Sequence, residues 1–244
     1  VIIPCYNVEI YLENCLNSLI QTNYTNYEII LINDGSTDGT KKICERYATS
    51  YNFVKFINQE NKGVGFARNL GIENAIGKYI CFFDPDDIIV GNPFVMLENY
   101  INDGFNLIML DYYDVLRKRV AKREYGLYGE INKKEFKRKI LYLINTDMMY
   151  TIWNKVYKRE FLIKYRIRFD DTPMGQDVLF NLKIYKLVTK IMIINKAYYH
   201  YFQYREGSST NKLRENRYLF QLNELEKISN LLDFFGVDTK NFIF

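Results

Sequence analysis

The sequence predicts an α/β fold with a mainly parallel central sheet, followed by a C-terminal helical segment. Three observations predict this class. Residues 1–110 alternate strand and helix patterns, which is typical of a parallel sheet with right-handed crossovers. The 244 residues are 48% hydrophobic, which is enough for a full core. Residues 79–83 are apolar throughout, as in a strand buried on both faces.

In the first half, strand and helix patterns follow one another directly. Strands are expected at residues 1–4, 27–32, 53–57, 79–83 and 106–110. Helices are expected at residues 10–21, from Thr37 or Asp38, at 66–74 and from Pro93, a residue that suits the first helical position. A loop at residues 61–65 precedes the third helix.

The second half is less regular. The basic segment 117–129 indicates either a mobile excursion or an antiparallel pair of strands. Helices are expected at residues 133–144, 159–165, 178–187 and 213–235, and strands at 190–194 and 197–203. An acidic loop at 170–177 leads into the third of these helices. Asp177 would suit the start of that helix, where capping and the helix dipole favour a carboxylate. This is the structural explanation for an aspartate at position 177.

Composition limits the function and the compartment. The net charge of +4 is too small to argue for nucleic acid as a partner. Basic clusters at 117–123 and 133–139 are either solvated faces or a surface attracted to anionic lipid. Four scattered cysteines indicate a reducing compartment, and no signal peptide or membrane-spanning run is visible. Both ends lie in apolar runs, so we expect residues to be missing there.

Polar loops follow three of the predicted strands: Tyr6-Asn7, residues 33–36 and residues 84–87. Ligands of parallel sheets bind at the carboxyl ends of strands, so these loops should converge on one site. Carboxylates grouped after a buried strand repel one another, and Mg²⁺ or Mn²⁺ would relieve that repulsion. The alternative is an acidic turn in which Asp87 caps the next helix. The sequence contains no P-loop, and Arg68 breaks the dinucleotide fingerprint after Gly63 and Gly65.

These motifs resemble the family 2 glycosyltransferases, whose GT-A fold is a Rossmann-like three-layer sandwich. The order and spacing of four motifs match: VIIPCYN at 1–7, NDGSTD at 33–38, ARNLG at 67–71 and DPDD at 84–87. Three further motifs extend the resemblance to about residue 210: WNK at 153–155, GQD at 175–177 and REGSS at 205–209.

The resemblance implies roles for individual residues. Tyr6 and Asp34 would hold the nucleobase and ribose, and Arg68 would lie near the diphosphate or support the site. Asp84 and Asp86 would be the D-x-D pair, with Asp86 the direct ligand of Mn²⁺ or Mg²⁺. Asp177 would be the catalytic base. The remaining expected substrate-binding residues are Pro4, Asn7, Gly35, Ser36, Trp153, Lys155 and Arg205.

Three positions need separate comment. Gln176 stands where the family more often has Glu, which removes a negative charge beside Asp177. Pro85 replaces a small residue and stiffens the turn between Asp84 and Asp86. His200, the only histidine, is either a packed strand residue or a further metal ligand.

The family transfers a sugar from a nucleotide sugar, usually a UDP-sugar, to a hydroxyl group with inversion. We therefore expect hexosyl or N-acetylhexosaminyl transfer to a glycan or lipid-linked acceptor, in polysaccharide biosynthesis for the cell envelope. Residues 1–110 would bind the nucleotide sugar, 111–210 the acceptor, and 211–244 would form a helical extension. The expected location is the cytoplasm, at the inner face of the membrane, with a homodimer left open. The alternatives are a nucleotidyltransferase that makes nucleotide sugars and a catalytically silent nucleotide-binding homologue.

Overall fold

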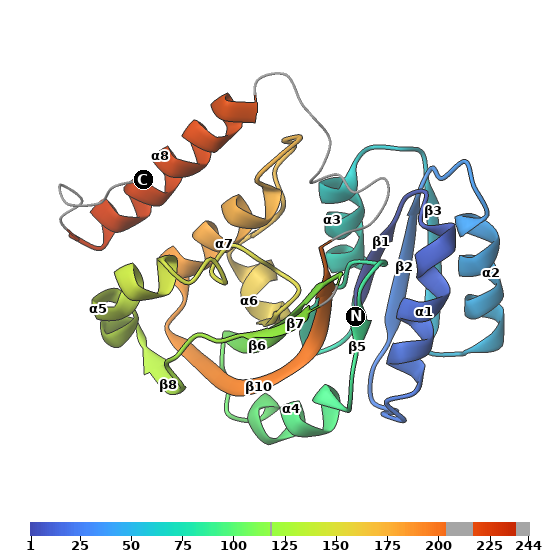
Figure 1. Ribbon diagram of the computed structural model, residues 1–244, viewed down its shortest axis with the longest axis horizontal. Helices are drawn as coiled ribbons and strands as arrows, with labels where there is room; N and C mark the ends of the chain where they lie inside the picture. The colour runs from blue at the N-terminus through green and yellow to red at the C-terminus, as the bar shows by residue number, and fades with distance from the viewer. Residues whose placement is uncertain (118, 204–216, 238–244) are drawn as a thin grey trace.

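The structure is a computed structural model that describes residues 1–117, 119–203 and 217–237 (Figure 1). Its first half is a parallel sheet of three strands in the order β1-β2-β3. The strands are β1 (Ile2–Cys5), β2 (Ile29–Asp34) and β3 (Val54–Gln59). The first two are buried along their whole length, as their continuous apolar sequences predict.

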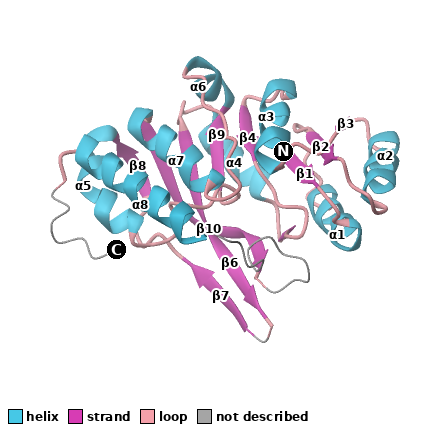
Figure 2. Cartoon of the chain, turned by 90° about the horizontal axis from the view of Figure 1, so that it is seen from above, coloured by secondary structure: helices cyan, strands magenta, loops and turns pink. Residues whose placement is uncertain are grey.

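Helices cover both faces of this sheet. They are α1 (Glu9–Ile20), α2 (Thr40–Ser50) and α3 (Val64–Asn74). Figure 2 shows α1 and α3 on opposite faces. The helix α3 packs on β1 and β2, so its first turns begin beside the carboxyl ends of these strands. This arrangement confirms the alternation expected for the first half.

The second half is built on a larger, mixed sheet in the order β4-β9-β6-β10-β5. A parallel bridge between Ile2 and Phe82 joins it to the first sheet. Among the described strands of this sheet, only β6 and β10 pair in parallel. The strands are β4 (Tyr79–Cys81), β5 (Ile88–Ile89), β6 (Leu107–Leu116), β9 (Lys155–Lys158) and β10 (Lys190–Phe202), with β7 (Arg119–Arg123) on β6 and β8 (Gly129–Asn132) on β10.

Five helices complete the described part of the chain, and two of them begin at caps that the sequence carries. They are α4 (Pro93–Ile101), α5 (Lys133–Ile144), α6 (Arg159–Lys164), α7 (Gln176–Leu187) and α8 (Arg217–Phe234). Asn92 accepts a hydrogen bond from the N–H of Val95 at the start of α4. Asn132 and Glu135 form a capping box at the start of α5.

Some elements differ from expectation. Residues 190–194 and 197–203 were expected as two strands, but they form the single strand β10, because bulges near Ala197 accommodate the polar pair Asn195-Lys196. The segment after β6 is the antiparallel pair rather than the excursion. The predicted strand 79–83 ends at Cys81. The expected loop 205–209 and the start of the last helix lie outside the described residues.

Among the helices in the described ranges, none is both long and apolar enough to cross a bilayer.

Candidate active site

The loops after β1 and β2 are tied to each other at the carboxyl edge of the first sheet. The N–H of Asn7 donates to Oγ of Ser36 over 3.1 Å, and the N–H of Thr37 donates to Oδ1 of Asn7 over 2.8 Å. Asn7 has φ 51°, which an asparagine tolerates. Pro4 is buried in β1, whereas the ring of Tyr6 is about half exposed and available to a ligand. Two of the three predicted loops therefore meet.

Asp34, the last residue of β2, organises the approach to α3. Its carboxylate is 3% exposed and accepts hydrogen bonds from the N–H groups of Lys62 (2.9 Å) and Gly63 (2.8 Å) and from the amide of Gln59 (2.6 Å). A Cβ at Gly35 would lie 2.7 Å from the backbone nitrogen of Asn61, so only glycine allows this loop to approach. Asp34 thus fixes the loop that leads into α3.

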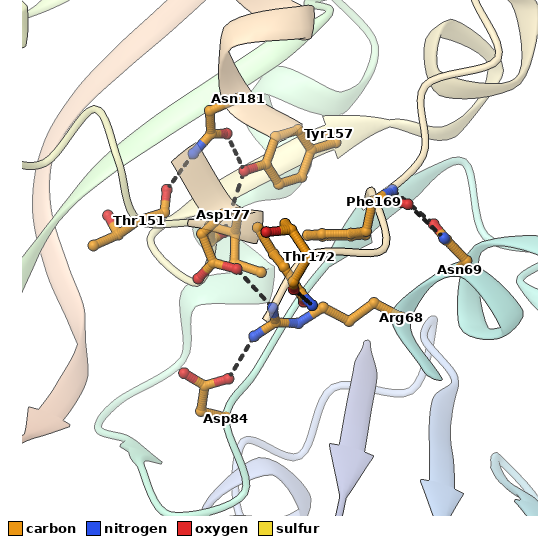
Figure 3. Close-up of polar contacts among 11 residues, drawn as sticks. Arg68, Asn69, Asp84, Thr151, Tyr157, Phe169, Thr172, Asp177 and Asn181 are labelled. Atoms are coloured by element: carbon orange, nitrogen blue, oxygen red, sulfur yellow. Dashed lines mark hydrogen bonds and ion pairs between the residues drawn. The ribbon is translucent and has the colours of Figure 1, made fainter. Parts of the chain in front are cut away.

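Arg68 of α3 is the centre of the site (Figure 3). Its Nη1 donates to Oδ1 of Asp177 over 2.6 Å, and its Nη2 donates to Oδ1 of Asp84 over 3.1 Å. The guanidinium carbon lies 5.3 Å from the ring centroid of Phe169. Burial lowers the pKa of Arg68, but the charges of Asp177 and Asp84 outweigh burial and raise it. One cation thus joins carboxylates that are far apart in the sequence.

Close packing holds Arg68 in this position. A Cβ at Gly71, one turn further along α3, would lie 2.4 Å from Cγ2 of Ile2, so the helix rests directly on β1. The side-chain amide of Asn69 donates a hydrogen bond to the carbonyl of Phe169 (2.9 Å) and accepts one from the N–H of Phe169 (2.8 Å). These contacts tie α3 to the segment before α7, which brings Asp177 beside Arg68.

Asp177 does not cap α7 but lies in its first turn, where the helix dipole favours a carboxylate, so only the capping part of the structural explanation is wrong. Gly175 is the N-cap, in the left-handed conformation with φ 74°, and no side chain caps the helix. The side chain of Asp177 is 32% exposed and faces Arg68. Burial, the largest effect, and the charge of Asp84 raise the pKa of Asp177, and together they outweigh the lowering by Arg68 and Lys155. A carboxylate with a raised pKa is a stronger proton acceptor than an ordinary one, which suits a general base.

The three carboxylates of the acidic turn after β4 have different surroundings. Asp87 is fully buried and accepts hydrogen bonds from the Tyr199 hydroxyl (2.7 Å) and the N–H of Phe202 (2.8 Å). It therefore does not cap α4, because Asn92 does. Burial, followed by the charges of Asp86 and Asp84, raises the pKa of Asp87, so the three carboxylates interact.

Asp86 lines a groove of about 930 Å³ between α1 and β5. Within the residues that the structure describes, no three His, Cys, Asp or Glu side chains form a ready metal cluster. The donor set nevertheless fits a hard divalent cation, since Asp84 and Asp86 offer carboxylate oxygens on one short turn and the charges of both act on the buried Asp87.

Two residues that were expected to bind substrate, Lys155 and Trp153, are buried. Lys155 is 1% exposed, and its Nζ donates to the carbonyl of Met148 (2.6 Å) and to Oδ1 of Asn154 (2.9 Å). Burial lowers the pKa of Lys155. Trp153 stacks on Tyr199 and Tyr201. Both residues thus support the site from the interior of the protein.

His200 packs against Tyr113, with ring centroids 4.9 Å apart. It follows Tyr199 in β10, so its side chain points to the opposite face of the sheet from the carboxylates. The structure does not bring it to Asp84 and Asp86. Arg205 lies outside the described residues.

Sequence reasoning missed Tyr199, whose hydroxyl contacts both the carboxylate of Asp87 and the N–H of Asp84. The tyrosine-rich stretch 198–201 was the available signal. It also missed the network one turn along α7 from Asp177, where Asn181 joins the Tyr157 hydroxyl (2.8 Å) to the carbonyl of Thr151 (2.9 Å). No local pattern marks that network, because its members come from three separate segments.

Comparison with known proteins identifies relatives of the chain. GlyA of Streptococcus pneumoniae, a glycosyltransferase, is 33% identical over 228 residues, which are 85% of this chain and 31% of GlyA. TarS of Staphylococcus aureus, a poly(ribitol-phosphate) beta-N-acetylglucosaminyltransferase, is 29% identical over 215 residues, 85% of this chain and 36% of TarS. The chain therefore spans about a third of the length of these relatives.

Solved structures confirm the GT-A type of α/β fold. The structure of TarS residues 1–349 with UDP-GlcNAc matches with a TM-score of 0.75 and 22% identity, covering 98% of this chain and 73% of that one. The mannosyltransferase PcManGT of Pyrobaculum calidifontis, in complex with GDP-Man and Mn²⁺, matches with a TM-score of 0.61 and 14% identity, covering 96% of this chain and 72% of that one.

The family model described as Glycosyl transferase family 2 matches residues 1–166. This match includes the loops after β1 and β2, Arg68 and the acidic turn. Because it covers more than half of the chain, the protein belongs to glycosyl transferase family 2.

Proposed function

We propose that this protein is an inverting glycosyltransferase that moves a sugar from a UDP-sugar to a hydroxyl group of a glycan or lipid-linked acceptor. The observation that carries the proposal is the position of Arg68 between Asp84 and Asp177. It joins the acidic turn, where a diphosphate would bind, to a carboxylate that can take a proton. Family membership and the TarS structure with UDP-GlcNAc support the same reaction class.

On the donor side, residues 1–110 would bind the nucleotide sugar. The exposed ring of Tyr6 offers a stacking surface for a base, and the loops held by Asp34 and Ser36 form the wall beside it. Arg68 would balance part of the charge of the diphosphate. Asp86, with Asp84, would hold Mn²⁺ or Mg²⁺, and the Mn²⁺ complex of the mannosyltransferase supports this choice. The cation would neutralise the departing UDP.

On the acceptor side, residues 111–210 would present the base. Asp177 would accept the proton of the attacking hydroxyl as its oxygen bonds to the anomeric carbon. The bond from that carbon to UDP breaks, and its electron pair leaves with the diphosphate. Attack from the face opposite to UDP inverts the anomeric configuration. The raised pKa of Asp177 suits this role, because the carboxylate holds the proton more firmly than an ordinary aspartate would.

The acceptor proposal extends to cell-envelope polymers. TarS carries poly(ribitol-phosphate) in its name, and a polyol chain of that kind offers free hydroxyls on every repeating unit. We place the reaction at the inner face of the cytoplasmic membrane, where lipid-linked polymers are assembled. The basic strand β7 and helix α5 would face anionic lipid there, and a homodimer is compatible with this placement.

The test is UDP release from UDP-GlcNAc, UDP-glucose and UDP-galactose with Mn²⁺, with and without poly(ribitol phosphate) as acceptor. We expect one donor to release UDP faster when the acceptor is present. Pyrophosphate release from UTP and a sugar phosphate would instead indicate the nucleotidyltransferase. Binding of UDP without release from any donor would indicate the silent homologue.

A further inference from the structure

The hydroxyl of Tyr199 in β10 holds both ends of the acidic turn after β4. It accepts a hydrogen bond from the N–H of Asp84 over 3.1 Å and donates one to Oδ2 of Asp87 over 2.7 Å. Because an N–H group can only donate, the phenol proton is left for the carboxylate. Oδ1 of Asp87 accepts from the N–H of Phe202, the last residue of β10, over 2.8 Å. The first and last residues of the turn are therefore anchored to one strand, with Asp86 between them.

Stacking keeps the ring of Tyr199 in place. The ring is nearly parallel to that of Trp153, with 4.6 Å between the centroids and 12° between the planes. The ring of Phe83 lies 5.3 Å from it, and Tyr199 is buried. A ring packed between two others cannot turn away without opening the core. Its hydroxyl is therefore a fixed point to which the turn is tied.

Other hydrogen bonds already close the acidic turn. The N–H of Asp87 donates to the carbonyl of Asp84 over 3.2 Å, and the N–H of Phe83 donates to the carbonyl of Ile2 over 3.0 Å. The tie between Tyr199 and Asp87 is added to these at a cost, because the carboxylate is desolvated and burial raises its pKa. This tie fixes the direction of the turn relative to β10 rather than closing it.

We propose that Tyr199 is a positioning residue that makes the metal site of Asp84 and Asp86 selective for a small divalent cation, Mg²⁺ over Ca²⁺. This inference rests on the proposed function, in which these two carboxylates hold the metal. Mg²⁺ requires a nearly ideal octahedral set of ligands, whereas Ca²⁺ accepts more ligands in a flexible arrangement. A turn held at both ends can meet the strict requirement of Mg²⁺, and a turn that is free to shift would suit Ca²⁺ nearly as well.

The test measures how much each cation strengthens the binding of UDP to the full chain. Calorimetry gives the Kd of UDP in EDTA, in Mg²⁺ and in Ca²⁺, and the gain from a cation is the EDTA value divided by the value with that cation. In the wild type, we expect a larger gain from Mg²⁺ than from Ca²⁺. In Tyr199→Phe, the gain from Mg²⁺ should fall about tenfold, because both hydrogen bonds of the hydroxyl are lost. The gain from Ca²⁺ and the affinity in EDTA should change much less.

Tyr185→Phe is the matched control for loss of stability. Tyr185 is buried like Tyr199, and its hydroxyl donates over 2.6 Å to the carbonyl of Met149, a partner outside the acidic turn. Both variants lose a buried hydrogen bond and should melt a few degrees below the wild type. Tyr185→Phe should nevertheless keep both gains. An equal loss of the Mg²⁺ gain in this control would mean that general loosening is the cause, and it would overturn the proposal.

A double variant keeps the test decisive if Tyr199→Phe fails to fold because the buried Asp87 lacks its donor. In Tyr199→Phe/Asp87→Asn, the buried charge is removed, so Tm should recover, but the turn is still not anchored. The gain from Mg²⁺ should then no longer exceed that from Ca²⁺. A ratio of the two gains that stays at the wild-type value in either variant would overturn the proposal. In the wild type, equal gains from the two cations would overturn this inference alone, whereas no gain from either would also refute the metal part of the proposed function.

Discussion

Replacing Asp177 with asparagine separates its chemical role from its structural one. The side chain keeps its shape, and its amide oxygen can still accept the hydrogen bond from Nη1 of Arg68, which also keeps its bond to Asp84 at 3.1 Å. An amide does not accept a proton at neutral pH. Loss of a general base lowers the rate by about 10²–10⁴. We therefore expect transfer by Asp177→Asn to be at least about a hundredfold slower, with UDP affinity unchanged.

The structure also predicts whether Asp177→Asn raises or lowers the melting temperature. Weakening one charge-assisted hydrogen bond costs about 1 kcal/mol, or roughly 2–4 °C in a chain of this size. Against this, the pKa of Asp177 is raised, so its ionised form destabilises the fold at neutral pH. Burial is the larger effect, so Asp177→Asn should melt at or above the wild-type temperature at pH 7.5. As the pH falls through the raised pKa, Asp177 becomes protonated and the difference should vanish.

The assay is UDP release with acceptor present, paired with a pH series of thermal melts. Asp171→Asn is the matched control, because Asp171 lies in the same loop and is exposed. Wild-type turnover in Asp177→Asn would refute the assignment of the base, and Asp170 and Asp171 would be tested next. A melting temperature well below that of the wild type at pH 7.5 would refute the argument from burial.

Three further predictions follow from the site. Asp86→Asn should abolish the Mn²⁺-dependent part of UDP binding in calorimetry while leaving Tm within about 2 °C; equal UDP affinity in EDTA and Mn²⁺ for the wild type would contradict this. Asp34→Ala should weaken uridine and UDP to a similar degree, because it releases the loop beside the nucleoside; unchanged uridine binding would remove Asp34 from recognition. Gln176→Glu should keep activity within about tenfold but lower Tm by a few degrees, since a carboxylate cannot donate to the carbonyl of Thr172 as the amide does; a higher Tm would show that this hydrogen bond does not stabilise the loop.

The sequence was most informative where structure is decided locally. The predicted bounds 133–144 match α5, whose start is fixed locally by the capping box of Asn132 and Glu135. The start of α4 followed in the same way from Asn92 and Pro93. The loops at the ends of β1 and β2 could be placed together because parallel strands end at the same edge of a sheet.

The sequence was least informative where distant segments meet. A lysine in the motif at 153–155 suggested a ligand contact, but the chain before it turns back so that Nζ of Lys155 lies buried among the oxygens of Met148 and Asn154. Nothing local indicates that Asn195 and Lys196 sit in a bulge rather than between two strands. Tyr199 looked like one of several tyrosines in a strand, since its hydrogen bonds depend on how β10 lies beside the turn after β4.

The contact between Gly71 and Ile2 has a consequence for variants of this protein. The two residues touch no ligand in the proposed reaction, yet the helix that carries Arg68 rests on them with no space for a methyl group. A side chain at position 71 must tilt or lift that helix, and the guanidinium one turn away moves with it. Geometry errors of about 1 Å are enough to slow an enzyme a hundredfold. Loss-of-function substitutions will therefore appear on the buried side of the helix, where a survey confined to the cleft would not look for them.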